Sequence, residues 1–183
     1  MPRKRIRAIL FGPQGSGKTT QGQLLAERYG VPFIEARGAL RDEIESESAM
    51  GKLVKEYVDA KVLAPDDLVN AVMVKHLKKA ADQGFILDGY PRNIEQAESL
   101  DKIAKIQLAI QFKMTDERAV KRLDGRYKED DARRKLALYH FMTEPMASYY
   151  RQRGVLLAVN ADQKMEDLQE ELIKKMRKLG FSC

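Results

Sequence analysis

The segment Gly12–Gln21, which reads GPQGSGKTTQ, has the residue types and the spacing of a phosphate-binding loop. It follows the pattern G-x-x-x-x-G-K-[ST], in which Lys18 and Thr19 come directly after Gly17. Glycines such as Gly15 and Gly17 lack a Cβ atom, so backbone N–H groups can turn inward around a polyanion. Lys18 can then reach the outer phosphates, and the hydroxyl of Thr19 can face a bound Mg²⁺. The segment therefore predicts a polyphosphate site and leaves the phosphoryl acceptor open.

A second segment, Gly84–Glu98, carries side chains that suit a second phosphate. An apolar run ends at Asp88, and a carboxylate there can hold the water shell of a Mg²⁺ beside the loop. A glycine-proline turn then brings Arg92 to the mouth of the same crevice, where a guanidinium can grip a phosphate with two hydrogen bonds. Gln96 lies one helical turn further on, and its amide can donate and accept, as reading a nucleobase edge requires.

These side chains need a sheet to position them. The predicted strands are short and apolar: Ile6–Phe11, Val31–Ile34, Phe85–Leu87, Leu108–Phe112 and Val155–Val159. The predicted helices are Thr20–Tyr29, Asp66–Ala81, Ile94–Ile103, Thr115–Leu123, about Ala132–Arg153 and Met165–Leu179. In the first helix we expect Leu24 and Leu25 on the inner face, and residues 38–63 are also expected to be helical. The alternation predicts an α/β fold, a parallel sheet covered on both faces, with ligands beyond the carboxyl ends of the strands.

Length and composition fit one domain. The chain has 183 residues, 44% of them hydrophobic, and a net charge of +6. No apolar run approaches the roughly 20 residues that span a membrane, and no nucleic-acid-binding motif accompanies the positive charge. The one cysteine, Cys183, excludes an internal disulfide and a cysteine-based zinc site. We therefore expect a cytoplasmic monomer that binds small nucleotides, with no nucleic-acid or membrane partner.

From Ile6 to about Leu179 the chain resembles the adenylate kinase family of nucleoside monophosphate kinases. The motifs that carry the resemblance are GPQGSGKTTQ, Leu63–Asp67, Leu87–Arg92 with Gln96, Arg122–Arg126, Tyr139–Pro145 and Val159–Asp162. The resemblance implies a P-loop kinase domain over residues 1–183 with a five-stranded parallel sheet, a helical acceptor-binding insert at 35–64 and a short lid at 124–134. It also implies reversible, Mg²⁺-dependent phosphoryl transfer from ATP to a nucleoside monophosphate. The expected lid has no cysteines and therefore no zinc.

The resemblance further implies roles for single residues. The implied ATP contacts are Gly15, Ser16, Gly17, Lys18, Thr19, Thr20, Arg122 and Gln163. The implied acceptor contacts are Ala36, Arg41, Lys61, Val62, Leu63, Gly89, Arg92 and Gln96. The implied catalytic residues are Lys18, Arg92, Arg126 and a basic residue on the next helix, Arg134 or Lys135. The implied Mg²⁺ site is formed by Thr19 and Asp88.

The chain departs from the family pattern around the acceptor, so alternatives remain open. Ala36 replaces the threonine that commonly contacts the AMP base, and Lys61 replaces a glycine. Gln96 favours AMP as the acceptor, whereas Ala36 favours UMP or CMP. Thr19 stands where the family usually has glycine, as in metabolite kinases of the shikimate type, although the Asp88–Arg92 segment disfavours that activity. A non-catalytic nucleotide-binding protein is the remaining alternative. AMP kinase is the preferred hypothesis.

Overall fold

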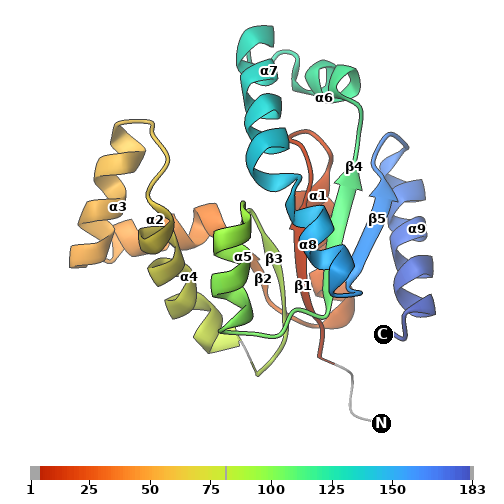
Figure 1. Ribbon diagram of the computed structural model, residues 1–183, viewed down its shortest axis with the longest axis horizontal. Helices are drawn as coiled ribbons and strands as arrows, with labels where there is room; N and C mark the ends of the chain where they lie inside the picture. The colour runs from red at the N-terminus through yellow and green to blue at the C-terminus, as the bar shows by residue number, and fades with distance from the viewer. Residues whose placement is uncertain (1–4, 81, 182–183) are drawn as a thin grey trace.

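The computed structural model describes residues 5–80 and 82–181 and contains a central sheet flanked by helices (Figure 1). Its strands are β1 (Arg7–Phe11), β2 (Phe33–Glu35), β3 (Phe85–Asp88), β4 (Leu108–Lys113) and β5 (Leu156–Asn160). They lie in the order β2-β3-β1-β4-β5, and every pairing is parallel. The prediction of a parallel α/β sheet is confirmed, with strand bounds shifted by one or two residues. Ala81 and Cys183 lie outside the described residues.

The register of the sheet brings the two predicted phosphate segments together. Asp88, the last residue of β3, is opposite Leu10 of β1 and Glu35 of β2. The chain leaves β1 after Phe11 to form the phosphate-binding loop, so the loop emerges at the same edge as Asp88. Carboxyl ends of parallel strands form the usual ligand edge of such sheets.

Helices cover both faces of the sheet (Figure 1). They are α1 (Lys18–Tyr29), α2 (Ala36–Glu45), α3 (Ala49–Asp59), α4 (Asp66–Ala80), α5 (Ile94–Asp101), α6 (Asp116–Leu123), α7 (Glu129–Leu138), the π-helical turn η1 (Tyr139–Thr143), α8 (Met146–Gln152) and α9 (Met165–Lys178). Strand side chains alternate between the faces. In β1, Leu10 packs in the cluster with α1 and α9, and Ile9 packs in the cluster with α4, α5 and α8.

Residues 38–63 were expected to be helical, and they form most of α2 and all of α3. The two helices approach closely at Gly51, where a Cβ atom would lie 2.0 Å from the carbonyl oxygen of Glu43. Ser48 caps α3 by accepting a hydrogen bond of 2.9 Å from the N–H of Gly51. The buried carboxylate of Glu43 pairs with Lys75 of α4 at 2.7 Å. This ion pair attaches the pair of helices α2 and α3 to α4.

One expectation about α1 is wrong. Leu24 is 42% exposed, whereas Leu25 is fully buried. The reason is Gly22, where a Cβ atom would lie only 2.4 Å from Cδ1 of Leu10. The helix turns its glycine and Gln21 toward the sheet, which leaves Leu24 on the outer side.

The prediction of a single helix over about Ala132–Arg153 is also wrong. The helix α7 already begins at Glu129, with three acidic residues in its first turn, which suits the positive end of the helix dipole. After Leu138 the backbone widens to a π turn, in which the N–H of Glu144 donates to the carbonyl of Tyr139 at 3.0 Å. The short helix α8 starts after Pro145, which has no N–H to continue the ladder.

Candidate active site

The phosphate-binding loop joins β1 to α1 at the carboxyl edge of the sheet. Gly15 and Gly17 have φ angles of 85° and 80°, a left-handed conformation that side chains disfavour. Gly17 is also the N-cap of α1, and no side chain caps this helix end. The first N–H groups of α1 are therefore available to an anion. Ser16 is fully buried in the loop.

Lys18, the first residue of α1, lies in the crevice above the sheet. Its Nζ donates a long hydrogen bond of 3.4 Å to the carbonyl of Pro13. Loss of solvent in the crevice lowers the pKa of Lys18, and the negative charge of Asp88 opposes that shift. Lys18 is a cation close to the loop, and a phosphate group would complete its hydrogen bonds.

Thr19 and Asp88 meet at the floor of the crevice. Oγ1 of Thr19 donates a hydrogen bond of 2.5 Å to Oδ2 of Asp88. Oδ1 of Asp88 is buried and has no hydrogen-bond partner within the described part of the chain. An unpaired buried carboxylate oxygen beside a threonine hydroxyl is a donor set that suits a hydrated divalent cation.

Arg92 follows the turn after β3. Its Nε donates to the carbonyl of Gly89 at 2.9 Å, which leaves the rest of the guanidinium toward the crevice. Desolvation and the positive charge of Arg37 lower the pKa of Arg92, and Asp88 opposes them. Arg92 and Arg37 thus lie close enough to repel each other.

Gln96 is buried beneath this turn. Its Oε1 accepts from the backbone N–H of Arg92 at 2.8 Å, and its Nε2 donates to Oδ1 of Asp66 at 2.6 Å. The other oxygen of Asp66 accepts from Asn93 at 2.6 Å. The amide is therefore held in one orientation before any nucleotide is bound.

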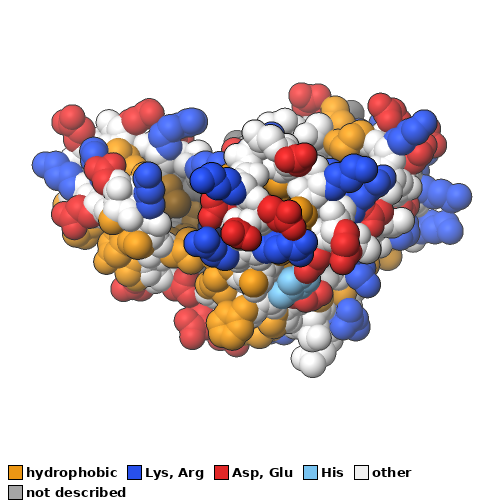
Figure 2. Space-filling model, turned by 90° about the horizontal axis from the view of Figure 1, so that it is seen from above, with side chains coloured by type: hydrophobic (Ala, Val, Ile, Leu, Met, Phe, Trp, Pro, Cys, Tyr) orange, Lys and Arg blue, Asp and Glu red, His pale blue; other side chains and the backbone are white. Residues whose placement is uncertain are grey.

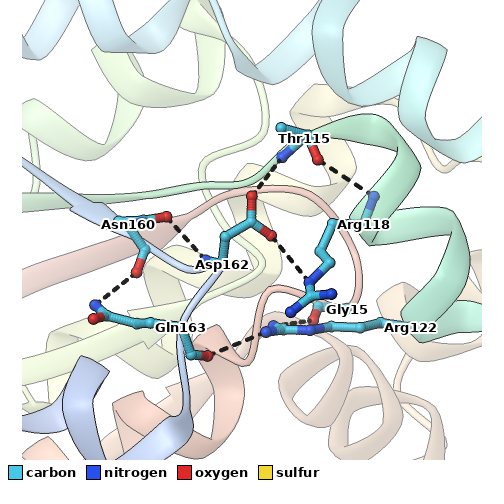
Figure 3. Close-up of polar contacts among 7 residues, drawn as sticks. All are labelled: Gly15, Thr115, Arg118, Arg122, Asn160, Asp162 and Gln163. Atoms are coloured by element: carbon cyan, nitrogen blue, oxygen red, sulfur yellow. Dashed lines mark hydrogen bonds and ion pairs between the residues drawn. The ribbon is translucent and has the colours of Figure 1, made fainter.

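A polar network joins the phosphate-binding loop to the segment after β5 (Figure 3). Arg122 of α6 donates to the carbonyl of Gly15 at 3.3 Å and to that of Gln163 at 3.2 Å. Arg118, one turn earlier, pairs with Asp162 at 3.6 Å. The two arginines hold α6, the loop and the β5–α9 connection together.

The segment between α6 and α7, together with α7 itself, carries further cations. Arg126 lines the crevice, and so does Lys135, whose Nζ lies 4.8 Å from the centre of the Tyr127 ring. Arg134 points elsewhere and pairs with Asp131 at 3.8 Å on the surface. Of the basic residues at 133–135, Lys135 is the one that faces the crevice.

The segment that was expected to bind the acceptor is arranged differently from the expected pattern. Ala36 is buried, with its Cβ 3.6 Å from the position that a Cβ of Gly89 would take. Arg41 is exposed and pairs with Glu45 at 3.8 Å. Arg37, which the motifs did not single out, lines the crevice instead. Its signal in the sequence is its place one helical turn before Arg41 and directly after β2.

Lys61 ends α3 in a left-handed conformation, with a φ angle of 56°. Its N–H donates to the carbonyl of Val58 at 3.1 Å, and the N–H of Val62 donates to that of Tyr57 at 3.1 Å. This pair of bonds is a Schellman motif, which normally places glycine at the position of Lys61. Lys61 keeps the backbone geometry that a glycine would give.

The phosphate-binding loop, the turn after β3 and the start of α2 border a cavity of about 1170 Å³. The expected site residues that line it are Gly15, Gly17, Lys18, Thr19, Thr20, Leu63, Asp88, Gly89, Arg92, Arg122, Arg126 and Gln163. The expected residues outside its lining are Ser16, Ala36, Arg41, Lys61, Val62, Gln96 and Arg134. From above, the lobe of α2 and α3 is set apart from the rest, with Lys and Arg side chains interspersed with Asp and Glu around the hollow (Figure 2).

The described residues lack two further features. None of the helices in residues 5–80 and 82–181 has the length and apolarity of a membrane span. Among the same residues, no three His, Cys, Asp or Glu side chains are grouped so that they could hold a metal ion.

Known proteins that are similar to this chain are adenylate kinases, in agreement with a site built around a phosphate-binding loop. A family model described as adenylate kinase matches residues 10–155. An adenylate kinase from Mycolicibacterium vanbaalenii is 36% identical over 185 residues, covering 96% of this chain and 99% of the relative. Adenylate kinase 1 from Nostoc sp. is 36% identical over 176 residues, covering 91% and 96%. An adenylate kinase from Caldicellulosiruptor bescii is 30% identical over 212 residues, covering 93% and 99%. The chain belongs to the adenylate kinase family.

Proposed function

We propose that the protein transfers the terminal phosphoryl group of ATP to AMP reversibly, giving two molecules of ADP. The observation that carries this proposal is one cavity of about 1170 Å³, lined by the phosphate-binding loop on one side and by Arg92 on the other. Cations on both sides suit two phosphate chains that meet end to end. The names of the relatives support the same reaction.

We assign the ATP phosphates to the loop. The uncapped N–H groups of α1 and the ammonium of Lys18 would bind them, and Arg122 and Gln163 would lie at the nucleoside end. We assign residues 35–64 to acceptor binding and residues 124–134 to the lid, because both flank the cavity. Phosphoryl transfer needs positioning and charge stabilisation more than covalent chemistry, which is what these residues can supply.

We assign stabilisation of the transferred group to Arg92, Arg126 and Lys135. A guanidinium directs several N–H donors at the equatorial oxygens, where negative charge is spread during transfer. Removing one such preorganised donor costs about 2.7–4 kcal/mol of the barrier. Lys135 replaces Arg134 in this assignment because it lines the cavity.

We place Mg²⁺ beside Thr19 and Asp88. The buried, unpartnered Oδ1 of Asp88 and the adjacent hydroxyl of Thr19 support this site. When bound, Mg²⁺ supplies positive charge that neutralises the phosphate oxygens. The protein's part is to orient the carboxylate of Asp88, which the hydrogen bond from Thr19 does.

We also propose that the protein is a cytoplasmic monomer. The phosphate-binding loop, Arg92 and Arg126 line one cavity within a single copy of the chain, which supports a site that a monomer can form. Light scattering across a tenfold range of concentration tests this: a mass that stays at 20.9 kDa supports it, and a doubled mass contradicts it.

The activity is tested by a coupled assay of ADP formation with ATP, Mg²⁺ and each monophosphate in turn. We expect AMP to have the highest kcat/KM among AMP, CMP, UMP, GMP and dTMP. A higher value for CMP or UMP would make the protein a pyrimidine monophosphate kinase, and no turnover with any of them would make it a binding protein. The variant Ala36→Thr restores the family's residue and should sharpen the preference for AMP.

A further inference from the structure

Arg37 is a cation in the crevice to which no family motif gives a role. It is the second residue of α2, directly after the carboxyl end of β2, and it lines the cavity together with Lys18 and Arg92. The register of β2 against β3 places Glu35 opposite Asp88. Arg37 is therefore anchored at the same edge of the sheet as the predicted Mg²⁺ ligand.

The position of Arg37 is electrostatically costly in the absence of an anion. Desolvation comes first in lowering the pKa of Arg92, and the charge of Arg37 comes next, ahead of the opposing charge of Asp88. Lys18 lines the same cavity and is a third cation there. Within residues 5–80 and 82–181, no carboxylate lies within ion-pair distance of the Arg37 guanidinium. Three mutually repelling cations around one space are stabilised when an anion enters it.

Arg41 differs from Arg37 in these respects. It lies one turn further along α2, is 72% exposed in its side chain, and pairs with Glu45 at 3.8 Å. It does not line the cavity. For Arg41 to bind a phosphate in the cavity, it would have to give up its pairing with Glu45.

We propose that Arg37 is a phosphate ligand of the acceptor site, and that Arg37 and Arg92 together grip the phosphate of the acceptor nucleotide. This inference rests on the proposed function, because it concerns the acceptor half of the same cavity. Arg37 reaches the cavity from the end of β2, and Arg92 reaches it from the end of β3. Two guanidiniums that follow the ends of neighbouring strands can bind different oxygens of one dianionic phosphate.

The proposal also explains how this chain functions with an unusual acceptor segment. Arg37 carries a side chain into the cavity at the start of α2, beside the small, buried Ala36. Ala36 packs against Gly89, so the start of α2 is held close to the turn that carries Arg92. The contact made by Arg37 recognises the charge of the acceptor's phosphate, and the choice of base is made by other residues.

Calorimetric titration of AMP into the full chain, without ATP, tests the proposal. Arg37→Ala should weaken AMP binding about 10- to 100-fold, as expected for loss of hydrogen bonds to a charged group. Arg37→Lys should recover part of that loss. Lys174→Ala, an exposed charge on α9 outside the cavity, is the control for a general effect of net charge and should bind AMP as the wild type does.

Two further measurements separate a phosphate ligand from a residue that only packs. Adenosine, which lacks the phosphate, should bind Arg37→Ala and wild type equally, and so should a non-hydrolysable ATP analogue. If Arg37→Ala binds AMP as well as or better than wild type, or if Arg41→Ala causes the larger loss, the proposal is overturned. A loss that is equal for adenosine and AMP would make Arg37 structural and would also overturn it.

Failure of the proposed function has a different signature. If wild type binds AMP but does not phosphorylate it, the proposed kinase activity is wrong. The effect of Arg37→Ala on AMP binding still tests whether Arg37 binds the phosphate. If wild type binds no AMP, both fall together.

Discussion

Thr19 and Asp88 are joined by a hydrogen bond of 2.5 Å, although 69 residues separate them in the chain. The bond connects the first turn of α1 to the end of β3 and therefore fixes the phosphate-binding loop relative to the carboxylate at the floor of the crevice. It uses Oδ2 of Asp88 and leaves Oδ1 buried and unpartnered within the described part of the chain. One carboxylate thus both orients a loop side chain and presents a free oxygen to the cavity.

We predict that Asp88→Asn weakens the response to Mg²⁺. The amide keeps the shape of the carboxylate but loses its charge, so the Mg²⁺ concentration for half-maximal rate should rise about 10- to 100-fold. Initial rates across a Mg²⁺ titration at saturating ATP and AMP measure it. An unchanged Mg²⁺ requirement would remove Asp88 from the metal site, and the melting temperature shows whether the variant is folded.

We predict that Lys18→Met removes most of the turnover while the fold persists. Loss of one charge-stabilising donor costs on the order of 100-fold or more in kcat. The crevice already disfavours the charged form of Lys18 by desolvation, so the neutral side chain should be tolerated without loss of stability. Circular dichroism and the coupled assay measure the two effects, and a folded variant with more than half of the wild-type kcat would contradict the assignment.

We predict a large difference between two neighbouring residues of α7. Lys135 lines the cavity, whereas Arg134 pairs with Asp131 at 3.8 Å on the surface. Lys135→Ala should lower kcat about 10- to 100-fold, by loss of a hydrogen bond from a charged donor. Arg134→Ala removes the same sign of charge from the same helix and should have a smaller effect. The reverse order would assign the family role to Arg134.

We predict that Lys61→Gly stabilises the protein. Lys61 has a φ angle of 56°, which costs a side-chain-bearing residue about 1–2 kcal/mol, whereas glycine adopts it freely. After the entropy cost of glycine, the free energy of unfolding should rise by about 0.5–1 kcal/mol. Ala60→Gly is the matched control, because Ala60 has a φ angle of −73° and glycine should destabilise it. Urea unfolding of both variants tests the pair, and stabilisation by Ala60→Gly as well would contradict the strain argument.

We predict that His140 stabilises the protein only at lower pH. Its Nε2 lies 2.8 Å from Oδ1 of Asp116 and its Nδ1 lies 2.7 Å from Oε2 of Glu144. Hydrogen bonds with Asp116 and Glu144 raise the pKa of His140 above its usual 6.5. The protonated form is therefore favoured in the folded state, and its contribution is fully present below pH 6.5 and is lost as the pH rises through the raised pKa.

The measurement is the free energy of unfolding of wild type and His140→Gln at several pH values. The difference between them should be largest below pH 6.5 and should shrink at higher pH. In an Asp116→Asn, Glu144→Gln background, the same substitution should lose this pH dependence. A difference that stays constant with pH would mean that His140 acts by packing alone.

The sequence predicted the sheet and the loop because both depend on local patterns. The apolar runs before Gly12 and Asp88 are short and bounded by turn residues. The sequence therefore predicted both that these runs are strands and that they end at the same edge of the sheet. The side of the cavity that Lys135 occupies could not be inferred, because it depends on where α7 begins. Three basic residues follow one another at 133–135, and a start at Glu129 instead of Ala132 changes which of them faces inward.

Arg37 and Gln96 show a second limit. An arginine on an exposed helix has the pattern of an ordinary surface residue, and only the three-dimensional neighbours of Arg37 show that it shares a space with Lys18 and Arg92. Gln96 was expected from its spacing after Arg92, but its bond to Asp66 crosses 30 positions of the chain. Such long-range pairings depend on how α4 packs against α5. The hydrophobic periodicity of each helix does not predict this packing.

The close approach of α2 and α3 at Gly51 joins the two helices of the proposed acceptor insert into one rigid unit. A Cβ atom at Gly51 would lie 2.0 Å from the carbonyl of Glu43, so the two helices touch backbone to backbone and have no layer of side chains in which to slide. We therefore expect α2 and α3 to behave as one rigid body. This body is joined to the rest of the chain after Glu35, near Lys61 and by the ion pair of Glu43 with Lys75 of α4, so any rotation of it must change at least one of these three connections.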